Sequence, residues 1–231
     1  MSDSASKKRP IRSFVIRSGR VTESQRKAIE EHWDDYVFEY QPQLLNLDEV
    51  FPNAAPLTVE IGFGMGDSLV EMAAASPEEN FLGIEVHRPG VGKLLHGVNA
   101  NGLTNLKVIC HDATEVIEHC FQKGSINRIL IFFPDPWHKK RHHKRRIVQP
   151  EFTKLLTSRL QSGGALHLAT DWQEYAEHML EVLEAEQGLT NANGPGNYWL
   201  APERPQTKFE RRGERLGHGV WDLLYTKPQQ L

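Results

Sequence analysis

The stretch LTVEIGFGMGD at residues 57–67 joins a short apolar run to three glycines. The run Leu57–Ile61 predicts a buried strand, and residues 68–75 after it predict a helix. Glycines at positions 62, 64 and 66 allow a tight turn and a close approach of the backbone to a ligand. Such turns serve several kinds of nucleotide site and also occur without a ligand, so the turn alone leaves the ligand open.

Strands and helices alternate along the rest of the chain. Further strands are predicted over residues 81–86, 106–110, 129–133, 165–169 and 220–225. Helices are predicted between them, over residues 91–99, 113–121, 151–160 and 174–186. Repeated β-α units indicate an α/β fold with a doubly wound, mainly parallel sheet and helices on both faces. Ligands of such sheets bind beyond the carboxyl ends of the strands.

The first fifty residues differ in character from the rest. We divide the chain into a basic N-terminal arm and helix at residues 1–50 and a main domain at residues 51–231. The spacing of Thr22 and Gln25 is that of a capping box, which predicts that the N-terminal helix begins near Thr22.

Two general features concern the compartment. The N-terminus is polar and basic without the apolar centre of a signal peptide, and no apolar run approaches the roughly 20 residues of a membrane span. Cys110 and Cys120 are the only cysteines, which favours free thiols over a disulfide framework or a metal site. The sequence therefore predicts a cytoplasmic protein with no membrane partner, and it leaves the choice between monomer and homodimer open.

Acidic residues recur where the predicted strands end. They are Glu60, Glu85, Asp112 and Asp135. A dinucleotide fingerprint would place its third glycine at position 67, but Asp67 stands there and would oppose a phosphate. Four carboxylates around one crevice suit a cationic ligand. S-adenosylmethionine has a sulfonium, an ammonium and ribose hydroxyls but no phosphate, so we expect it as the cofactor, held by the turn glycines Gly62, Gly64 and Gly66.

Each of the first three acids has two interpretations. Glu85 lies 19 residues after Gly66, close to the usual offset of a ribose-binding acid, and its alternative is an exposed loop acid. Glu60 binds either the methionine ammonium or the amides of the loop. Asp112 either meets the adenine amino group or caps the helix that begins at Ala113, and these two roles are compatible.

A second informative stretch is FFPDPWHKKRHHKRR at residues 132–146, where an apolar run ends in Pro134-Asp135-Pro136 and a basic segment follows. The segment 138–146 carries a charge of +6, and residues 1–27 carry another +6. Subtracting both from the net charge of −3 leaves −15 on the remaining residues. An acidic body with two basic strips can bind a nucleic acid at chosen places. Two solvated, mobile charge runs are the alternative.

The residues around this basic segment leave further alternatives. Trp137 either stacks on a base or packs beneath the segment, and we favour packing. His138, His142 and His143 could suggest a metal site, but six neighbouring cations and the absence of acid or Cys beside them argue against one. We expect no metal.

Five stretches together are similar to one known family: EIGFGMG, GIEVHRPGVG, FPDPWHKKRHHKRR, ATDW and TKFERRGERLGHGVWDL. The chain resembles bacterial tRNA (guanine-N7-)-methyltransferases over residues 59–225. The resemblance implies a Rossmann-like class I methyltransferase fold with a seven-stranded sheet. It also implies transfer of a methyl group from S-adenosylmethionine to N7 of a guanosine, at position 46 in the variable loop of tRNA.

The resemblance implies roles for individual residues. Glu60, Glu85 and Asp112 would contact the cofactor, and Asp135 would contact it and be catalytic. Substrate-binding positions would be Lys139, Asp171, Thr207, Lys208, Phe209 and Glu210. RNA-contacting positions would be Arg141, His142, His143, Lys144, Arg145 and Arg146.

Two of these positions have local alternatives. Asp171 and Glu174 have the spacing of a helix N-cap and its third residue, so Asp171 could serve as a cap. Lys208 and Glu210 could pair with each other on the surface.

Guanine N7 carries a lone pair and no proton, so its methylation needs positioning more than a general base. We expect Asp135 to orient guanine through N1–H and the N2 amine, and to stabilise the cationic product ring. Two other functions stay open: methylation of another RNA or a protein amine, and RNA binding without catalysis. A dehydrogenase is disfavoured by Asp67.

Overall fold

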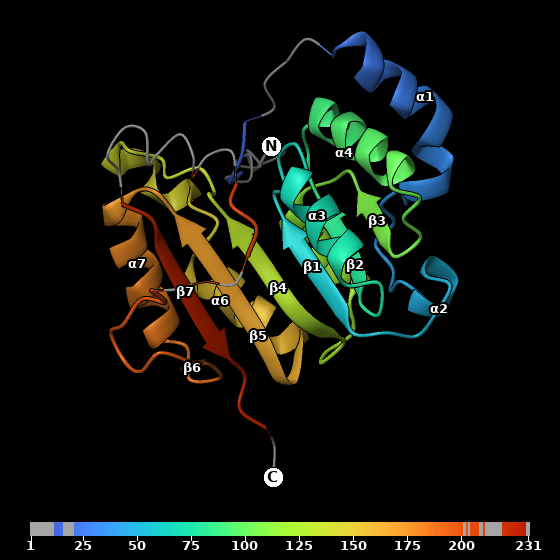
Figure 1. The fold of residues 1–231 in the computed structure, drawn as a ribbon. Coiled ribbons are helices and arrows are strands. Elements are labelled where there is room, and N and C mark those ends of the chain that lie inside the picture. Colours follow the sequence, from blue (N-terminus) through green and yellow to red (C-terminus); the bar gives the residue numbers. More distant parts are fainter. Residues whose placement is uncertain are drawn as a thin grey trace, which may run out of the picture.

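The computed structural model describes residues 12–15, 21–200, 202, 204–207, 210 and 219–229. Its centre is a seven-stranded sheet of order β3-β2-β1-β4-β5-β7-β6 (Figure 1). The strands are β1 (Leu57–Ile61), β2 (Asn80–Ile84), β3 (Leu106–Ile109), β4 (Ile126–Phe132), β5 (Leu160–Thr170), β6 (Thr190–Asn191) and β7 (Trp221–Thr226). β1 to β5 pair in parallel, while β7 runs antiparallel to β5 and β6. The predicted α/β class and mainly parallel sheet are confirmed.

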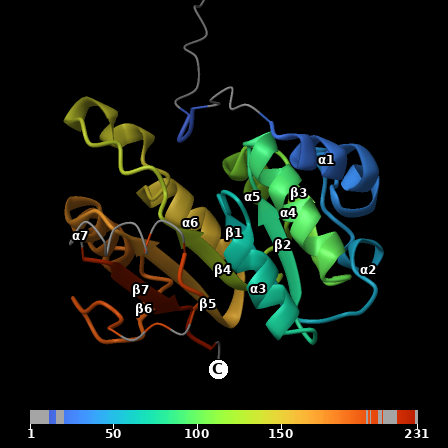
Figure 2. The same cartoon turned by 45° about the horizontal axis from the view of Figure 1, so that its top comes forward.

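Helices cover both faces of the sheet (Figures 1 and 2). They are α1 (Glu23–Tyr36), α2 (Leu47–Val50), α3 (Asp67–Ala75), α4 (Arg88–Ala100), α5 (Ala113–Cys120), α6 (Pro150–Arg159) and α7 (Gln173–Glu184). A 3-10 helix, η1, spans Lys140–Arg145. α1, α3 and α4 share one apolar cluster, while α5, α6 and α7 contribute to the other. The sheet is therefore doubly wound.

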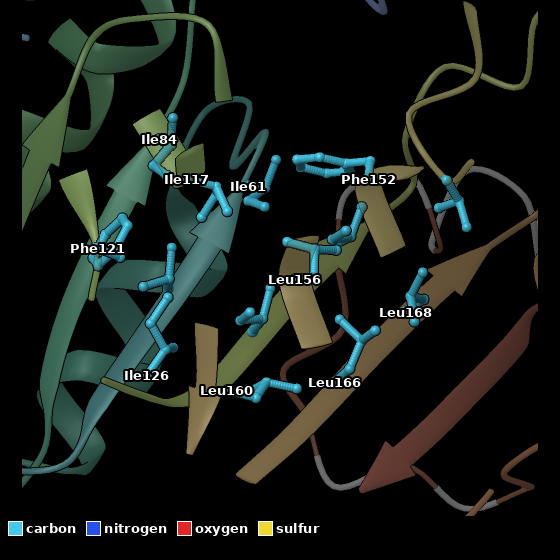
Figure 3. Close-up of a cluster of buried hydrophobic side chains, with 14 of the residues drawn as sticks. Ile61, Ile84, Ile117, Phe121, Ile126, Phe152, Leu156, Leu160, Leu166 and Leu168 are labelled. Carbon is cyan, nitrogen blue, oxygen red and sulfur yellow. The ribbon is translucent and has the colours of Figure 1, made fainter. Parts of the chain in front are cut away.

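Buried apolar side chains hold the second cluster together (Figure 3). Ile61 and Ile84 come from neighbouring strands, and Phe121 lies just after α5. Phe152 and Leu156 reach them from α6. β1 and β2 are buried along their whole length, as expected for central strands covered on both faces. This packing fixes the carboxyl ends of β1, β2 and β4 relative to one another.

The N-terminal helix α1 packs against α4 (Figures 1 and 2). Thr22 and Gln25 form both hydrogen bonds of the predicted capping box, which is confirmed. Gly92 of α4 lets the two helices approach, because a Cβ there would lie 2.8 Å from the Gln25 carbonyl oxygen. Residues 38–51 add side chains to the second cluster, Val50 and Phe51 among them. The division at residue 50 stays a prediction, and the described part of residues 1–50 packs against the main domain.

Two further expectations concern the described residues. Cys110 and Cys120 are free, as predicted. None of the described helices has the length and apolar character needed to cross a bilayer.

Candidate functional site

A cavity of about 530 Å³ opens at the carboxyl edge of the sheet. One wall is the turn after β1 together with the end of β2, and another is the turn after β4. Ser13 and Phe14 line it from the N-terminal segment, and Gln206 and Thr207 from the segment before β7. The cavity therefore lies where ligands of open α/β sheets bind.

The turn after β1 forms a cradle of backbone. Gly62, Gly64 and Gly66 have φ values of +74°, +61° and +75°, a conformation that favours glycine. A Cβ at Gly62 or Gly64 would meet no atom within 4 Å, so both positions face open space. Gly90, in the first turn of α4, approaches so closely that a Cβ there would lie 1.9 Å from the Gly64 carbonyl oxygen. The cradle thus exposes backbone to a ligand while α4 supports it from behind.

Glu85, directly after β2, is tied to the same cradle. Its carboxylate accepts hydrogen bonds from the backbone N–H of Gly64 at 2.9 Å, Val86 at 2.7 Å and His87 at 3.0 Å. Three donors fix its orientation at the cavity wall and leave acceptor capacity, because a carboxylate has about four lone-pair sites. Its predicted contact with ribose hydroxyls is compatible with this geometry and stays a prediction.

Glu60 is the most unusual acid of the site. It lies in β1 at the cavity wall with 2% of its surface exposed, and its Oε2 has no hydrogen-bond partner. Burial, with a smaller contribution from the charge of Glu85, raises the pKa of Glu60 to about 8. A buried carboxyl group without a partner is costly. A cationic N–H donor in the cavity would satisfy it.

Asp112 caps α5, because its carboxylate accepts a hydrogen bond from the Thr114 N–H at 3.0 Å. The capping alternative is therefore confirmed, and the adenine contact stays a prediction. Its neighbours His111 and Ala113 line the cavity, whereas Asp112 does not. Tyr40 stacks on His111 with ring centroids 3.8 Å apart, so residues outside the predicted motifs also shape this wall.

The turn after β4 presents Asp135 to the cavity. Asp135 is exposed and lines the cavity together with Phe133 and Pro134. Phe133 and Trp137, on either side of the Pro-Asp-Pro triplet, have φ values of 50° and 48°. Left-handed backbone is unfavourable for aromatic residues and tends to occur at functional sites. Two prolines and two such residues together restrict the backbone of the turn that carries Asp135.

Trp137 is half-buried beneath the basic segment. Its indole Nε1 donates to the Ser13 carbonyl at 3.1 Å, and the Arg145 guanidinium lies 4.3 Å from its ring centroid. Arg145 also donates through Nε to the Arg12 carbonyl at 3.0 Å. The packing role that we favoured for Trp137 agrees with these contacts, which tie the N-terminal segment to the basic segment.

The basic segment separates into two kinds of residue. Lys139, Arg141 and Lys144 are exposed, with Arg141 and Lys144 in η1. Arg146 is buried, with 3% exposure; its Nε donates to the Pro136 carbonyl at 2.9 Å and its guanidinium lies 4.8 Å from the Tyr175 ring. Arg146 thereby closes the loop that runs from Pro136 through η1. Its predicted RNA contact stays untested, but in this conformation its side chain points inward.

The histidines of the segment show local pairing. Arg141 Nε donates to His142 Nε2 at 3.3 Å, and His143 lies 3.5 Å from the Glu174 carboxylate. Desolvation, and then the charges of Arg141 and other nearby cations, lowers the pKa of His142 and disfavours its charged form. No cluster of three or more His, Cys, Asp or Glu side chains suited to a metal is found in the part of the chain that the structure describes.

The capping alternative for Asp171 is wrong. Helix α7 begins at Gln173 with Trp172 as its N-cap residue, and no side chain makes the cap hydrogen bond. Glu174 instead contacts Arg146 at 3.3 Å. Asp171 is thus not engaged as a cap, and its predicted substrate role stays open. The adjacent Trp172 packs edge-to-face on His138, next to Lys139, at 4.3 Å between ring centroids.

Thr207 and Glu210 form a reciprocal capping box. The Thr207 N–H donates to the Glu210 carboxylate, and the Glu210 N–H donates to Thr207 Oγ1, both at 3.2 Å. The Thr-x-x-Glu spacing is itself the sequence signal of such a box, so this pairing was predictable but is not among the predictions above. Lys208 and Phe209 lie outside the described residues, so the pair predicted between Lys208 and Glu210 is not tested.

Comparison with known proteins gives the family. A family model described as a putative methyltransferase matches residues 54–223. A tRNA (guanine-N(7)-)-methyltransferase from Ectopseudomonas mendocina (strain ymp) is 54% identical over 230 residues, covering 99% of this chain and 97% of that protein. One from Shewanella frigidimarina (strain NCIMB 400) is 56% identical over 220 residues, covering 95% and 92%.

Solved structures of lower identity agree in fold. The 16S rRNA methyltransferase KamB superposes with a TM-score of 0.59 at 17% identity, covering 80% of this chain and 95% of that one. The aminoglycoside resistance methyltransferase NpmB1 gives 0.55, also at 17% identity, with coverages of 80% and 94%. The Rossmann-like class I methyltransferase fold and the resemblance drawn from the five motifs are both confirmed, and the chain belongs to the tRNA (guanine-N(7)-)-methyltransferase family.

Proposed function

We propose that this protein transfers the methyl group of S-adenosylmethionine to N7 of a guanosine in tRNA, at position 46 of the variable loop. The observation that carries the proposal is the identity of 54–56% over nearly the whole chain to tRNA (guanine-N(7)-)-methyltransferases. The cavity adds the chemistry: carboxylates and a glycine cradle lie on one side and Asp135 on the other, and a basic segment follows Asp135 in the chain. We also infer a cytoplasmic location, which suits a tRNA substrate.

The residues of the cavity fit the cofactor. S-adenosylmethionine, when bound, supplies an electrophilic methyl group on a sulfonium. Glu60 offers an unpartnered buried oxygen, which suits the ammonium of its methionine part. Gly62 and Gly64 leave open space next to their backbone. Glu85 is pre-oriented by three backbone amides to accept hydroxyl donors of a ribose. Both a cation and a sugar therefore find partners on this wall.

Asp135 acts on the guanine in this proposal. Guanine N7 needs no deprotonation, so the carboxylate serves to orient the base through its N1–H and N2 groups. As N7 gains the methyl group the ring becomes cationic, and a fixed negative charge nearby stabilises that change. The rigid Pro-Asp-Pro turn suits this role, because a preorganised charge needs no rearrangement during the reaction.

The exposed cations of the basic segment bring the RNA to the cavity. Lys139, Lys140, Arg141 and Lys144 are exposed and follow Asp135 closely in the chain. Such residues neutralise phosphates and set register without reading bases. The predicted substrate residues Lys139 and Asp171 are chain neighbours of His138 and Trp172, whose rings pack together. We therefore infer that the variable loop approaches between this segment and Thr207.

One assay tests the proposal. Unmodified tRNA is incubated with the protein and S-adenosylmethionine labelled on its methyl group, and the label is located by nucleoside and by position. Label in 7-methylguanosine at position 46 is the expected result. Label in another nucleoside, in another RNA or in a protein amine would show that the enzyme has a different substrate from the one proposed. Binding of tRNA with no transfer and no cofactor binding would favour an RNA-binding module without catalysis.

A further inference from the structure

Arg204 occupies an unusual place between two carboxylates. Its side chain is 2% exposed. Through Nε and Nη2 it donates to both oxygens of Asp222 at 2.7 and 2.8 Å, and through Nη1 it donates to Glu210. A guanidinium presents its donors in a fixed fork, so these bonds determine the relative positions of both acids. Arg204 therefore joins the segment before β7 to β7 itself.

The two acids lead to different parts of the molecule. Asp222 lies in β7, is 3% exposed, and pairs at 2.7 Å with His167 of β5, so it belongs to the rigid sheet. Glu210 belongs to the capping box with Thr207, and Thr207 lines the cavity. The chain of contacts thus runs from the sheet through Arg204 and Glu210 to a residue on the cavity wall.

Arg204 also touches the other side of the cavity. Its guanidinium lies 5.3 Å from the ring centroid of Phe132 and 5.5 Å from that of Phe133. Phe133 has the left-handed φ of 50° and immediately precedes the Pro134-Asp135-Pro136 turn. Cation–π contact within about 6 Å is favourable, particularly where the cation is desolvated. One side chain therefore contacts the entry to the Asp135 turn and the box that holds Thr207.

The carboxylate of Glu210 is already occupied. It accepts hydrogen bonds from Arg204 Nη1, from Arg204 Nη2 at 3.3 Å and from the Thr207 N–H at 3.2 Å. With 13% side-chain exposure it has little contact with the solvent side, and it does not line the cavity. A direct contact of this carboxylate with a substrate base would require these bonds to be given up.

We propose that Arg204 is a positioning residue of the methyl-transfer site, which acts through Glu210 on Thr207 and through Phe133 on the Asp135 turn, so that the two substrate-facing walls keep a fixed separation around the guanine. This inference rests on the proposed function. It assigns Glu210 an indirect role, in which its carboxylate orients Thr207 and does not itself bind the base.

Arg204→Lys tests the inference, because lysine keeps the charge but cannot make the forked contacts with two carboxylates. We expect kcat/KM for tRNA to fall by about 100-fold, the fall that about 2.7 kcal/mol of lost positioning would give. The dissociation constant of S-adenosylmethionine should stay within about threefold, because the cradle and Glu60 are untouched. The matched control is Arg128→Lys, which breaks a half-buried pair with Glu79 away from the cavity and should leave kcat/KM within about threefold.

A double-mutant cycle with Glu210→Gln separates positioning from direct contact. If Arg204 and Glu210 act as one unit, the double variant should be no more than about threefold worse than Arg204→Lys alone. Losses that multiply would show that Glu210 acts independently of Arg204 and would overturn the inference. So would an Arg204→Lys variant with kcat/KM within threefold of wild type. A wild-type protein that fails to methylate tRNA would instead overturn the proposed function.

If Arg204→Lys does not fold, Asp222→Asn is the second variant that tests the same inference. Asp222 does not line the cavity, so a purely structural role predicts a lower melting temperature with unchanged kcat/KM at temperatures where the variant is folded. Positioning through Arg204 predicts a fall of about tenfold in kcat/KM for tRNA at those same temperatures, with unchanged cofactor affinity. Unchanged kcat/KM in the folded variant would count against the inference.

Discussion

Two sides of the cavity hold their charges in opposite ways. We call the ends of β1 and β2 the first wall, and the turn after β4 together with the segments packed behind it the second wall. On the first, Glu60 is buried with an unpartnered oxygen, and Glu85 is bonded only to backbone amides among its described hydrogen bonds. On the second, Arg204 lies between Asp222 and Glu210, and Arg146 reaches Glu174. On the first wall a buried carboxyl oxygen is left without a hydrogen-bond partner, whereas on the second the carboxylates behind the Asp135 turn are bound by arginine.

This difference indicates how one cavity takes two reactants of different charge. An unsatisfied carboxyl group gains most from a cationic ligand, because that ligand removes the cost of burial. Paired charges offer a ligand little, but they fix the backbone that carries Thr207 and Asp135. Under the proposed function, we therefore expect the unpartnered carboxyl group of the first wall to favour the cationic cofactor, and Asp135 and the exposed cations of the second wall to meet the RNA.

The largest effect is expected for Asp135→Asn, which keeps the shape of the second wall and removes its free charge. Turnover should fall by about 10²–10³-fold, as when one preorganised electrostatic group is removed from an active site. Cofactor affinity, measured separately by calorimetry, shows how much of the loss comes from the predicted contact of Asp135 with the cofactor. Single-turnover methylation of tRNA measures the loss. Near-normal turnover would mean that Asp135 is not the electrostatic partner of guanine.

The next largest effect is expected where helix α4 supports the glycine cradle of the first wall. Gly90→Ala places a methyl group 1.9 Å from the Gly64 carbonyl oxygen, so the glycine cradle must move. We expect a loss of about 1–3 kcal/mol in unfolding free energy, as for overpacked cores, and cofactor binding at least tenfold weaker. Denaturant titration and calorimetry measure the two.

Gly97→Ala, on the same helix α4, is the control for that variant. Its added methyl group would lie 3.1 Å from a Val70 side-chain carbon, and that side chain can yield. Stability should change by less than about 1 kcal/mol, because alanine also favours the helix. Equal effects of the two changes would show that α4 does not support the cradle.

Local sequence patterns predicted some parts of this structure, whereas contacts between residues far apart in the chain were not predicted. The central strands and the Thr22 cap follow from local patterns, which is why residues 57–61 were predicted as β1 has them. The predicted cap at Asp171 is wrong because α7 begins at Gln173 with Trp172 as its N-cap residue, and Glu174 contacts Arg146, 28 residues away in the chain. The Arg204–Asp222 pair joins residues 18 positions apart, and no periodicity in the sequence marks such a contact. Strands and a helix cap were thus predictable from the sequence, while ion pairs between distant side chains were not.

A third prediction concerns the buried carboxyl group of Glu60, whose Oε2 has no hydrogen-bond partner. Its folded-state pKa is raised from the usual 4.5 to about 8, so the folded protein holds this proton more tightly than the unfolded chain. The contribution of Glu60 to stability is therefore complete below pH 4.5, falls as the pH rises towards 8, and is level beyond it. Denaturant midpoints between pH 5 and 9 should show this decline in wild type, and Glu60→Gln should lose it.

Cofactor binding should depend on the same carboxyl group. Loss of a charge-assisted hydrogen bond in Glu60→Gln predicts binding about 10–100-fold weaker. The matched control is Asp67→Asn, which changes an exposed acid at the cavity that pairs with Lys93 at 3.1 Å, and should cost less than about threefold. Wild type should also release a proton on binding near pH 7, seen as a buffer-dependent calorimetric enthalpy. Binding without proton release would mean that Glu60 does not meet the cation.

The smallest effect compares two cations of the second wall. Lys144 is exposed in η1, so Lys144→Gln should weaken tRNA binding a few-fold and lower the slope of log affinity against log salt by about 1. Arg146 is buried against Tyr175 and the Pro136 carbonyl, so Arg146→Gln should lower stability and affinity but keep the wild-type slope. Titrations of tRNA between about 50 and 200 mM salt distinguish the two. A reduced slope for Arg146→Gln would show that this guanidinium leaves its buried position to neutralise a phosphate, and the division of the basic segment into anchor and contact residues would fail.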